Sequence, residues 1–183
     1  MLFDETIKWK CLATFMDNPE KEFFVNGIAR DLKISAGSAS RVCHELEGEG
    51  YLKSEEKGTA LFYSLDNESP VVKRLKSAWF LKKLMKYRSS WENDEVLSAA
   101  LYGSRSSGEF ISKSDVDIII ITNAKKESIE KGFEKMKKDL GAMLTVTIFT
   151  LAEWMDLAKK KDRFYIEVIA NHTSLSGAPL VVG

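Results

Sequence analysis

The first half of the chain alternates apolar and polar positions at helical spacing and then changes to strand-like runs. Apolar residues recur every three or four positions between residues 7 and 15 and again between 26 and 32, which predicts two short helices. Ser35 is a typical helix-capping residue, and the apolar positions from 39 to 46 share one face of a third helix. Residues 51–54 and 60–65 then have strand character and are joined by a turn. The predicted order is therefore helices followed by a small hairpin.

The second half of the chain alternates apolar strands with amphipathic helices. Three apolar runs have the length of strands, at residues 96–102, 115–122 and 144–150. Three stretches have helical spacing, at residues 127–140, 151–160 and 162–170. A last short apolar run at 179–182 is predicted as a strand. This alternation predicts a layered α/β domain in which helices flank a mixed sheet.

A charged helix separates the two patterns. Ser69 and Pro70 form a typical helix start, with serine as the cap and proline at the first position. The helical spacing continues to about residue 88, and a polar stretch then breaks it. We therefore predict a two-domain protein of mixed α+β and α/β class. Its parts are a helix-and-hairpin domain at residues 1–68, a linker helix and boundary at 69–94, and an α/β domain at 95–183.

Composition narrows the function only a little. Of the 183 residues, 44% are apolar and 30% charged, as in folded globular proteins. The 27 basic and 27 acidic residues cancel, so net charge gives no support for nucleic-acid binding. The chain has no apolar run near the ~20 residues of a membrane helix and no signal peptide. Two cysteines are too few for a disulfide framework, so we expect a cytoplasmic protein with no membrane partner.

Residues 103–117 carry the most informative chemistry of the chain. Asp115 and Asp117 stand at i and i+2 at the start of a strand, so both carboxylates face the same side. Two aligned carboxylates suit a hard cation such as Mg²⁺. Upstream, the backbone of Gly103 and the hydroxyl of Ser104 suit the phosphates that Mg²⁺ accompanies, and Arg105 adds a two-pronged cationic donor. The segment therefore predicts a site for a metal-bound nucleotide.

The same residues resemble the minimal nucleotidyltransferases of the DNA polymerase β superfamily. The family pattern is an apolar residue and a Gly-Ser turn, followed after a spacer by two acids that flank an apolar residue; here it covers Tyr102 to Asp117 within residues 95–183. The resemblance implies that Asp115 and Asp117 are catalytic metal ligands and that Mg²⁺–NTP is bound. It further implies transfer of a nucleotidyl group to a protein or nucleic-acid hydroxyl. Relatives include antitoxins that modify a partner toxin.

The sequence departs from this family at one position of the site. The family has a third carboxylate on a later strand, which binds metal and acts as base for the attacking hydroxyl. The corresponding strand, residues 144–150, presents Thr145 and Thr147 instead, and threonine is no base at neutral pH. General-base catalysis is worth ~10²–10⁴-fold in rate. An alternative interpretation is therefore a transcriptional regulator whose transferase domain is a catalytically impaired nucleotide sensor.

The segment from Gly27 to Leu65 resembles a winged helix-turn-helix domain. In that family the third helix enters the major groove of DNA with its N-terminal part, and the hairpin forms the wing. The resemblance implies DNA contacts from the following residues: Ser38, Ser40, Arg41 and Lys57. Three acids later in the same helix oppose phosphate binding: Glu45, Glu47 and Glu49. Another interpretation is a scaffold that forms a homodimer or binds a protein partner through this domain.

Overall fold

The structure is a computed structural model that describes residues 6–181. The chain divides into two compact units, one ending at Trp79 and the other beginning at Phe80. This division falls inside the segment predicted as a linker, residues 69–94, while the bounds of the two domains stay predictions. Among the described residues, none of the helices combines the length and the apolar character needed to cross a membrane.

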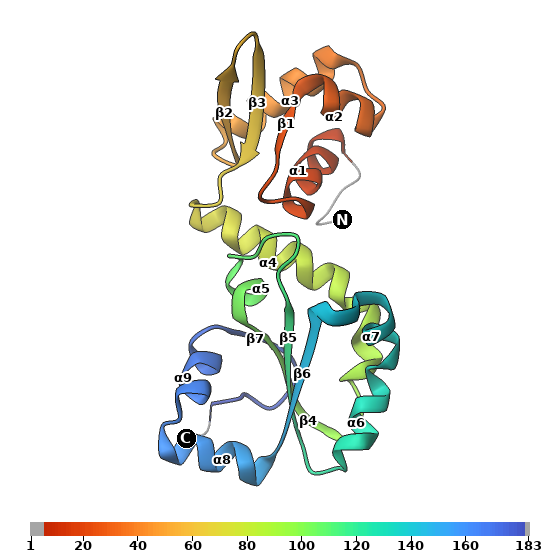
Figure 1. Ribbon diagram of the computed structural model, residues 1–183, viewed down its shortest axis with the longest axis vertical. Coiled ribbons are helices and arrows are strands. Elements are labelled where there is room, and N and C mark those ends of the chain that lie inside the picture. Colours follow the sequence, from red (N-terminus) through yellow and green to blue (C-terminus); the bar gives the residue numbers. More distant parts are fainter. Residues whose placement is uncertain (1–5, 182–183) are drawn as a thin grey trace. The chain divides into compact units, whose positions relative to one another are not determined.

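The N-terminal unit has three helices and a small antiparallel sheet (Figure 1). Its elements are α1 (Ile7–Asp17), β1 (Glu22–Phe24), α2 (Val25–Leu32), α3 (Ala36–Gly48), β2 (Leu52–Lys57) and β3 (Ala60–Leu65). Strand β3 lies between β1 and β2 and pairs antiparallel with both. The arrangement is the predicted winged helix-turn-helix, with α3 as its third helix and β2–β3 as its wing. Strand β1 was not predicted.

The core of the N-terminal unit is formed by the inward faces of α1, α2 and α3. Ile28, Ala39 and Leu46 are buried there, as their helical spacing predicts. Cys11 and Cys43 are both buried free thiols whose Sγ atoms lie 3.9 Å apart, within hydrogen-bond distance for sulfur.

Helix α4 (Pro70–Leu84) and the 3₁₀-helix η1 (Met85–Ser90) follow the wing. Val72 of α4 belongs to the N-terminal core, whereas Leu84 belongs to a core of the C-terminal unit. The predicted linker helix thus contributes apolar side chains to both units.

The C-terminal unit is a four-stranded mixed sheet with helices on both faces, as predicted. Its further elements are β4 (Val96–Tyr102), α5 (Gly103–Ser107), β5 (Val116–Thr122), α6 (Lys126–Gly132), α7 (Glu134–Leu140), η2 (Gly141–Met143), β6 (Leu144–Thr150), α8 (Leu151–Lys160), α9 (Arg163–Ala170) and β7 (His172–Gly177). The strand order is β6-β5-β4-β7. Strands β5 and β6 are parallel, and β4 is antiparallel to both β5 and β7.

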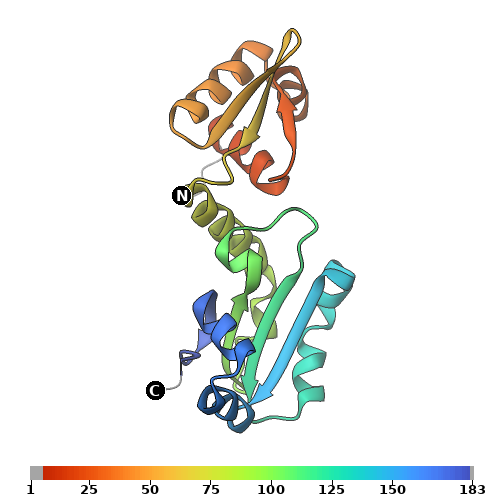
Figure 2. The same cartoon turned by 60° about the vertical axis from the view of Figure 1, so that its left-hand side comes forward.

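Strand β5 is central, which explains its run of isoleucines. Ile118 and Ile120 pack on the side covered by α6 and α7, and Ile119 and Ile121 on the side of α8 and α9 (Figures 1 and 2). A strand buried on both faces has no polar side, so its sequence is continuously apolar. By alternation, Asp117 shares the α8/α9 side with Ile119.

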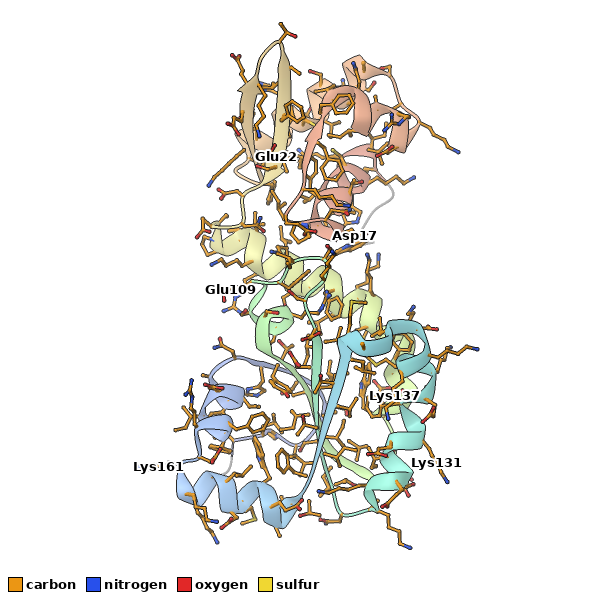
Figure 3. The ribbon with its side chains drawn as sticks, viewed as in Figure 1. Asp17, Glu22, Glu109, Lys131, Lys137 and Lys161 are labelled. Carbon is orange, nitrogen blue, oxygen red and sulfur yellow. The ribbon has the colours of Figure 1, made fainter. Side chains whose placement is uncertain are left out.

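Three predicted elements differ from the structure. Residues 179–181 form no strand, and the last strand is instead β7, while Val182 lies outside the described residues. The predicted helix 127–140 is divided at Phe133, whose φ of −96° and ψ of 0° end α6 and begin α7. Both halves keep one face on the sheet and the charged face outside, where Lys131 is exposed (Figure 3). Strand β2 extends to Lys57, so the wing turn is shorter than predicted.

Candidate functional site

The strand register lines up three site residues across the sheet. Tyr102 of β4 is the register partner of Asp117 on β5, and Asp117 is the partner of Thr145 on β6. Partners on neighbouring strands lie side by side with their side chains on the same face. Of the two threonines predicted at the position of the third acid, Thr145 is therefore the one beside Asp117, and Thr147 lies two residues further along, opposite Ile119.

Gly103 connects the predicted phosphate turn to the carboxylate pair. Its φ is +70°, and a Cβ atom placed on it would lie 2.8 Å from Oδ2 of Asp117. Glycine tolerates both this backbone conformation and the close approach, whereas other residues do not. Gly103 and the Asp117 carboxylate are therefore in direct contact, although 13 residues lie between them in the sequence.

The two carboxylates differ in environment. Asp115 is exposed, while Asp117 is half-buried beside Tyr102. Burial raises the pKa of Asp117, the negative charge of Asp115 raises it further, and Arg105 acts in the opposite direction. A divalent cation between the carboxylates would remove their repulsion, so the donor set suits Mg²⁺, which is typically held by one or two carboxylates together with phosphates and water.

Arg105 follows the turn but faces the protein interior. It is only 7% exposed, and its Nε and Nη2 atoms donate hydrogen bonds to backbone carbonyls in the loop before β5. Burial lowers the pKa of its guanidinium, while Asp115 and Asp117 oppose this shift. The contact between Arg105 and phosphate stays a prediction. In the structure, the guanidinium donates its hydrogen bonds to backbone carbonyls instead.

A pocket of about 330 Å³ opens beside the turn. Gly103, Ser104 and Tyr102 line it together with Phe164 and Glu167 of α9 and with Asn171, the residue after that helix. The Tyr102 and Phe164 rings meet edge to face, with centroids 5.8 Å apart. Glu109, labelled in Figure 3, borders the pocket from the loop after α5. No local motif marks α9, because only the folded sheet brings it to the turn.

The two acids that flank β6 in the sequence are engaged elsewhere. Asp139 accepts a hydrogen bond from the Tyr87 hydroxyl at 2.7 Å. Glu153 caps α8 by accepting from the backbone N–H of Thr150 at 2.7 Å. Within residues 6–181, no group of three or more acid, histidine or cysteine side chains is arranged for a metal ion. Among these residues, neither Asp139 nor Glu153 therefore joins Asp115 and Asp117 as a third acid.

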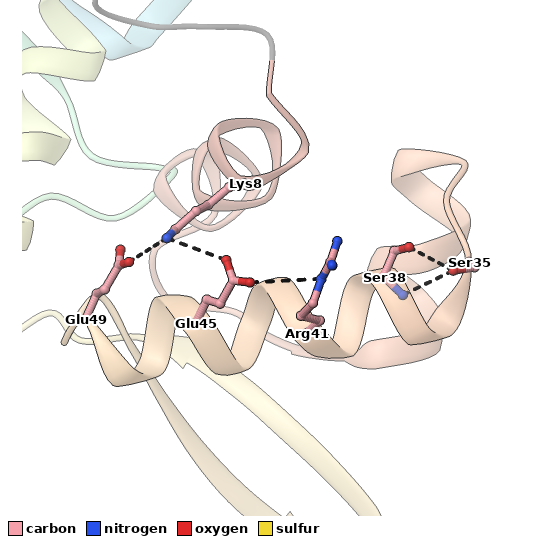
Figure 4. Close-up of polar contacts among 6 residues, drawn as sticks. All are labelled: Lys8, Ser35, Ser38, Arg41, Glu45 and Glu49. Atoms are coloured by element: carbon pink, nitrogen blue, oxygen red, sulfur yellow. Dashed lines mark hydrogen bonds and ion pairs between the residues drawn. The ribbon is translucent and has the colours of Figure 1, made fainter.

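The predicted DNA-contacting residues lie on α3 and the wing. Figure 4 shows two of them, Ser38 and Arg41. Ser38 is half-buried, and its backbone N–H donates to the hydroxyl of the capping residue Ser35 at 3.1 Å. Ser40 and Arg41 are exposed. The Nε atom of Arg41 lies 3.9 Å from Glu45 at i+4, an exposed pair of small energetic value.

Two further cations of the N-terminal unit, Lys8 and Lys57, form ion pairs with acidic side chains. Lys8 forms ion pairs with Glu45 and Glu49, so α1 partly neutralises the acidic end of α3 (Figure 4). Lys57, beside the wing turn, pairs with Glu22 and Glu55. The side chain of Arg41 keeps 74% of its surface exposed, compared with 43% for Lys57.

Comparisons with solved structures give distant similarities. One is to a possible transcriptional regulator from Methanosarcina mazei Go1, with 13% identity, a TM-score of 0.35, and coverage of 49% of this chain and 81% of that one. Another is to a chain from the tri-AMPylated Shewanella oneidensis HEPN toxin in complex with MNT antitoxin. It has 16% identity, a TM-score of 0.32, and coverage of 58% and 73%. No curated protein matches significantly.

The comparison with family models is more informative. The model of the nucleotidyltransferase domain matches residues 81–173, which is just over half of the chain. The matched range contains the Gly103 turn, the Asp115 and Asp117 pair and strands β4, β5 and β6. The chain therefore belongs to the nucleotidyltransferase domain family.

Proposed function

We propose that the C-terminal unit binds Mg²⁺–NTP, with Asp115 and Asp117 as metal ligands and Gly103 and Ser104 against the phosphates. The contact of Gly103 with the Asp117 carboxylate is the observation that carries this proposal. It brings a turn suited to phosphate next to the carboxylates that suit the metal of a metal–phosphate complex. Tyr102 and Phe164 add an aromatic wall beside the turn.

Binding is better supported than transfer. Nucleotidyl transfer requires an acceptor hydroxyl to lose its proton as it attacks the α-phosphorus and pyrophosphate leaves. Bound Mg²⁺ would neutralise phosphate charge, whereas a base beside the acceptor has to come from the protein. Because Thr145 is the register partner of Asp117, we propose that transfer to a protein or nucleic-acid hydroxyl is slow and that nucleotide binding is the main property of the site.

Removal of the metal is the first test. Nucleotide binding is expected to be measurable by calorimetry with each of the four NTPs in Mg²⁺ and to disappear when EDTA replaces Mg²⁺, because the triphosphate would then meet two uncompensated carboxylates. Restoring excess Mg²⁺ should restore binding. Binding of equal strength in Mg²⁺ and in EDTA would contradict the proposed metal-dependent site.

The winged helix supports a second function, DNA binding in a nucleotide-responsive regulator. The specific observation is the exposure of Ser40 and Arg41 at the part of α3 that enters the major groove in this fold. The ion pairs of Lys57 with Glu22 and Glu55 reduce the support for a wing contact. Recognition would therefore depend mainly on α3.

Arg41→Ala tests the DNA-binding proposal. We expect the affinity for duplex DNA from the protein's own promoter to fall by about 1–3 kcal/mol if Arg41 contacts a base edge. Arg163→Ala is the matched control, since Arg163 also pairs with a glutamate at i+4 but lies in the C-terminal unit. Gel-shift titrations at several salt concentrations measure both variants. Equal affinities for the wild type and Arg41→Ala would exclude Arg41 as a DNA contact.

A further inference from the structure

The Asp115 carboxylate is delivered by a loop rather than by a strand. The loop follows α5, and β5 begins only at Val116. A local turn orders part of it: the Ser114 N–H donates to the Ile111 carbonyl at 3.1 Å, and the Ile111 N–H donates to the Ser114 hydroxyl at 2.9 Å. This turn lies within the loop and does not itself connect the Asp115 backbone to another element of the unit.

The Arg105 guanidinium connects the loop to α5 through hydrogen bonds to loop carbonyls. Its Nε donates to the carbonyl oxygens of Ser114 at 3.2 Å and Asp115 at 3.1 Å. Its Nη2 donates to the carbonyl oxygens of Ser112 at 3.4 Å and Ser114 at 2.7 Å. The guanidinium thus binds the backbone carbonyls of Ser112, Ser114 and Asp115. Asp115 is one of the two proposed metal ligands. Hydrogen bonds from a charged donor are stronger than neutral ones.

Two aromatic rings fix the guanidinium in place. Its Cζ atom lies 4.3 Å from the ring centroid of Phe80 and 4.8 Å from that of Phe110. These stacking contacts, together with the low exposure of Arg105, hold the planar group in one orientation. Phe110 is itself a loop residue, so the stacking and the hydrogen bonds act on the same segment. Lysine has neither the plane nor the fork needed to reproduce this set of contacts.

We propose that Arg105 is a positioning residue that holds the backbone of Asp115 so that the Asp115 and Asp117 carboxylates are prearranged for a divalent cation. This inference rests on the proposed function, because it assumes that these carboxylates bind the metal. It assigns Arg105 a role through the loop instead of a direct contact with phosphate. Residues that orient metal ligands typically change metal affinity by about 10–100-fold when they are replaced.

Two substitutions distinguish the positioning role of Arg105 from a direct contact with phosphate. Arg105→Met keeps an apolar stem between the two rings and removes every donor. Arg105→Lys keeps the charge and the stem but loses the planar fork, and it guards against a Met variant that fails to fold. A direct phosphate ligand would tolerate lysine, which binds phosphate as a point charge. Arg88→Gln is the control, because Arg88 is an exposed arginine of the same unit that pairs with Glu92.

The experiment measures metal affinity and loop order on the full-length protein without nucleotide. Mn²⁺ binding is followed by electron paramagnetic resonance, and hydrogen exchange is followed at the Ile111 and Ser114 amides. We expect both Arg105 variants to bind Mn²⁺ at least about tenfold more weakly and to exchange these amides roughly tenfold faster. Arg88→Gln should match the wild type in both measurements, and thermal melts should remain cooperative.

The outcomes are distinguishable. Wild-type Mn²⁺ affinity in Arg105→Lys overturns the positioning role, whether or not NTP affinity falls, since that pattern indicates a phosphate contact or a purely structural residue. Unchanged amide exchange in both Arg105 variants also overturns it, because the loop would then be held without the arginine. Absence of Mn²⁺ binding by the wild type overturns the proposed function itself and the positioning role with it.

Discussion

Replacing Thr145 with aspartate is expected to raise the rate of nucleotidyl transfer by about 10²–10⁴-fold, the usual contribution of a positioned general base. Thr145 is the register partner of Asp117, so the new carboxylate would stand beside the existing pair on the same face of the sheet. Thr145 is also exposed, and an aspartate there would remain hydrated in the metal-free protein. Three neighbouring carboxylates repel one another, so Mg²⁺ should stabilise this variant more than it stabilises the wild type.

Thr147→Asp is the matched control for this gain of activity. Thr147 is the next residue of β6 on the same face, but it is opposite Ile119 and its hydroxyl lies 3.3 Å from that of Tyr102. It is displaced along the strand by about 6–7 Å, so it should raise transfer much less. The assay is covalent incorporation of label from α-labelled NTP in cell lysate. A Thr145→Asp variant that binds nucleotide but transfers no faster than the wild type would show that the base position is elsewhere.

Gly103→Ala is expected to weaken Mg²⁺-dependent NTP binding by about 10–100-fold, as displaced metal ligands generally do. The added Cβ would lie 2.8 Å from the Asp117 Oδ2 atom, so either the turn or the carboxylate has to move. The positive φ of this residue adds a cost of about 1–2 kcal/mol in the free energy of unfolding, because an L side chain is strained there. The substitution should therefore change both stability and affinity.

Gly141→Ala distinguishes the two effects. Gly141 has a φ of +58°, but a Cβ atom on it would have no neighbour within 4 Å. This control should lose stability through backbone strain while NTP affinity stays at the wild-type value. Chemical denaturation measures the first quantity and calorimetry the second. Equal affinities for Gly103→Ala and Gly141→Ala would contradict the contact between the turn and the carboxylate pair.

Strongly periodic segments made most of the fold predictable from the sequence. Strand β5 was recognisable because both of its faces are buried and its residues are continuously apolar. Strand β7 was not, since it has few apolar residues and exists through its pairing with β4. The apolar run at 179–182 was the more conspicuous strand signal, but among its described residues Leu180 is buried by packing against Trp154. In both segments, contacts with residues distant in the sequence determine whether a strand forms.

The site was predictable only as far as local geometry determines it. Alternation along a strand predicted that Asp115 and Asp117 share a side, but β5 begins at Val116, so the loop before it positions Asp115. Which of Thr145 and Thr147 lies beside Asp117 could be read only from the β5–β6 register, which depends on the folded sheet. The interior orientation of Arg105 depends on Phe80, which is distant in the sequence. Because Arg105 directly follows the Gly-Ser turn, the sequence suggested that it binds phosphate. Nothing in the local sequence indicates that the Phe80 ring lies against it.

Calorimetry of Mg²⁺–NTP binding by the wild type and by an Asp115→Ala, Asp117→Ala double variant tests the central claim most directly. Both proteins are titrated in Mg²⁺ and in EDTA, and thermal melts establish that the variant is folded. The account predicts binding by the wild type in Mg²⁺ and its loss both in EDTA and in the double variant. Equal affinity of the two proteins in Mg²⁺ would contradict a metal–nucleotide site at this carboxylate pair.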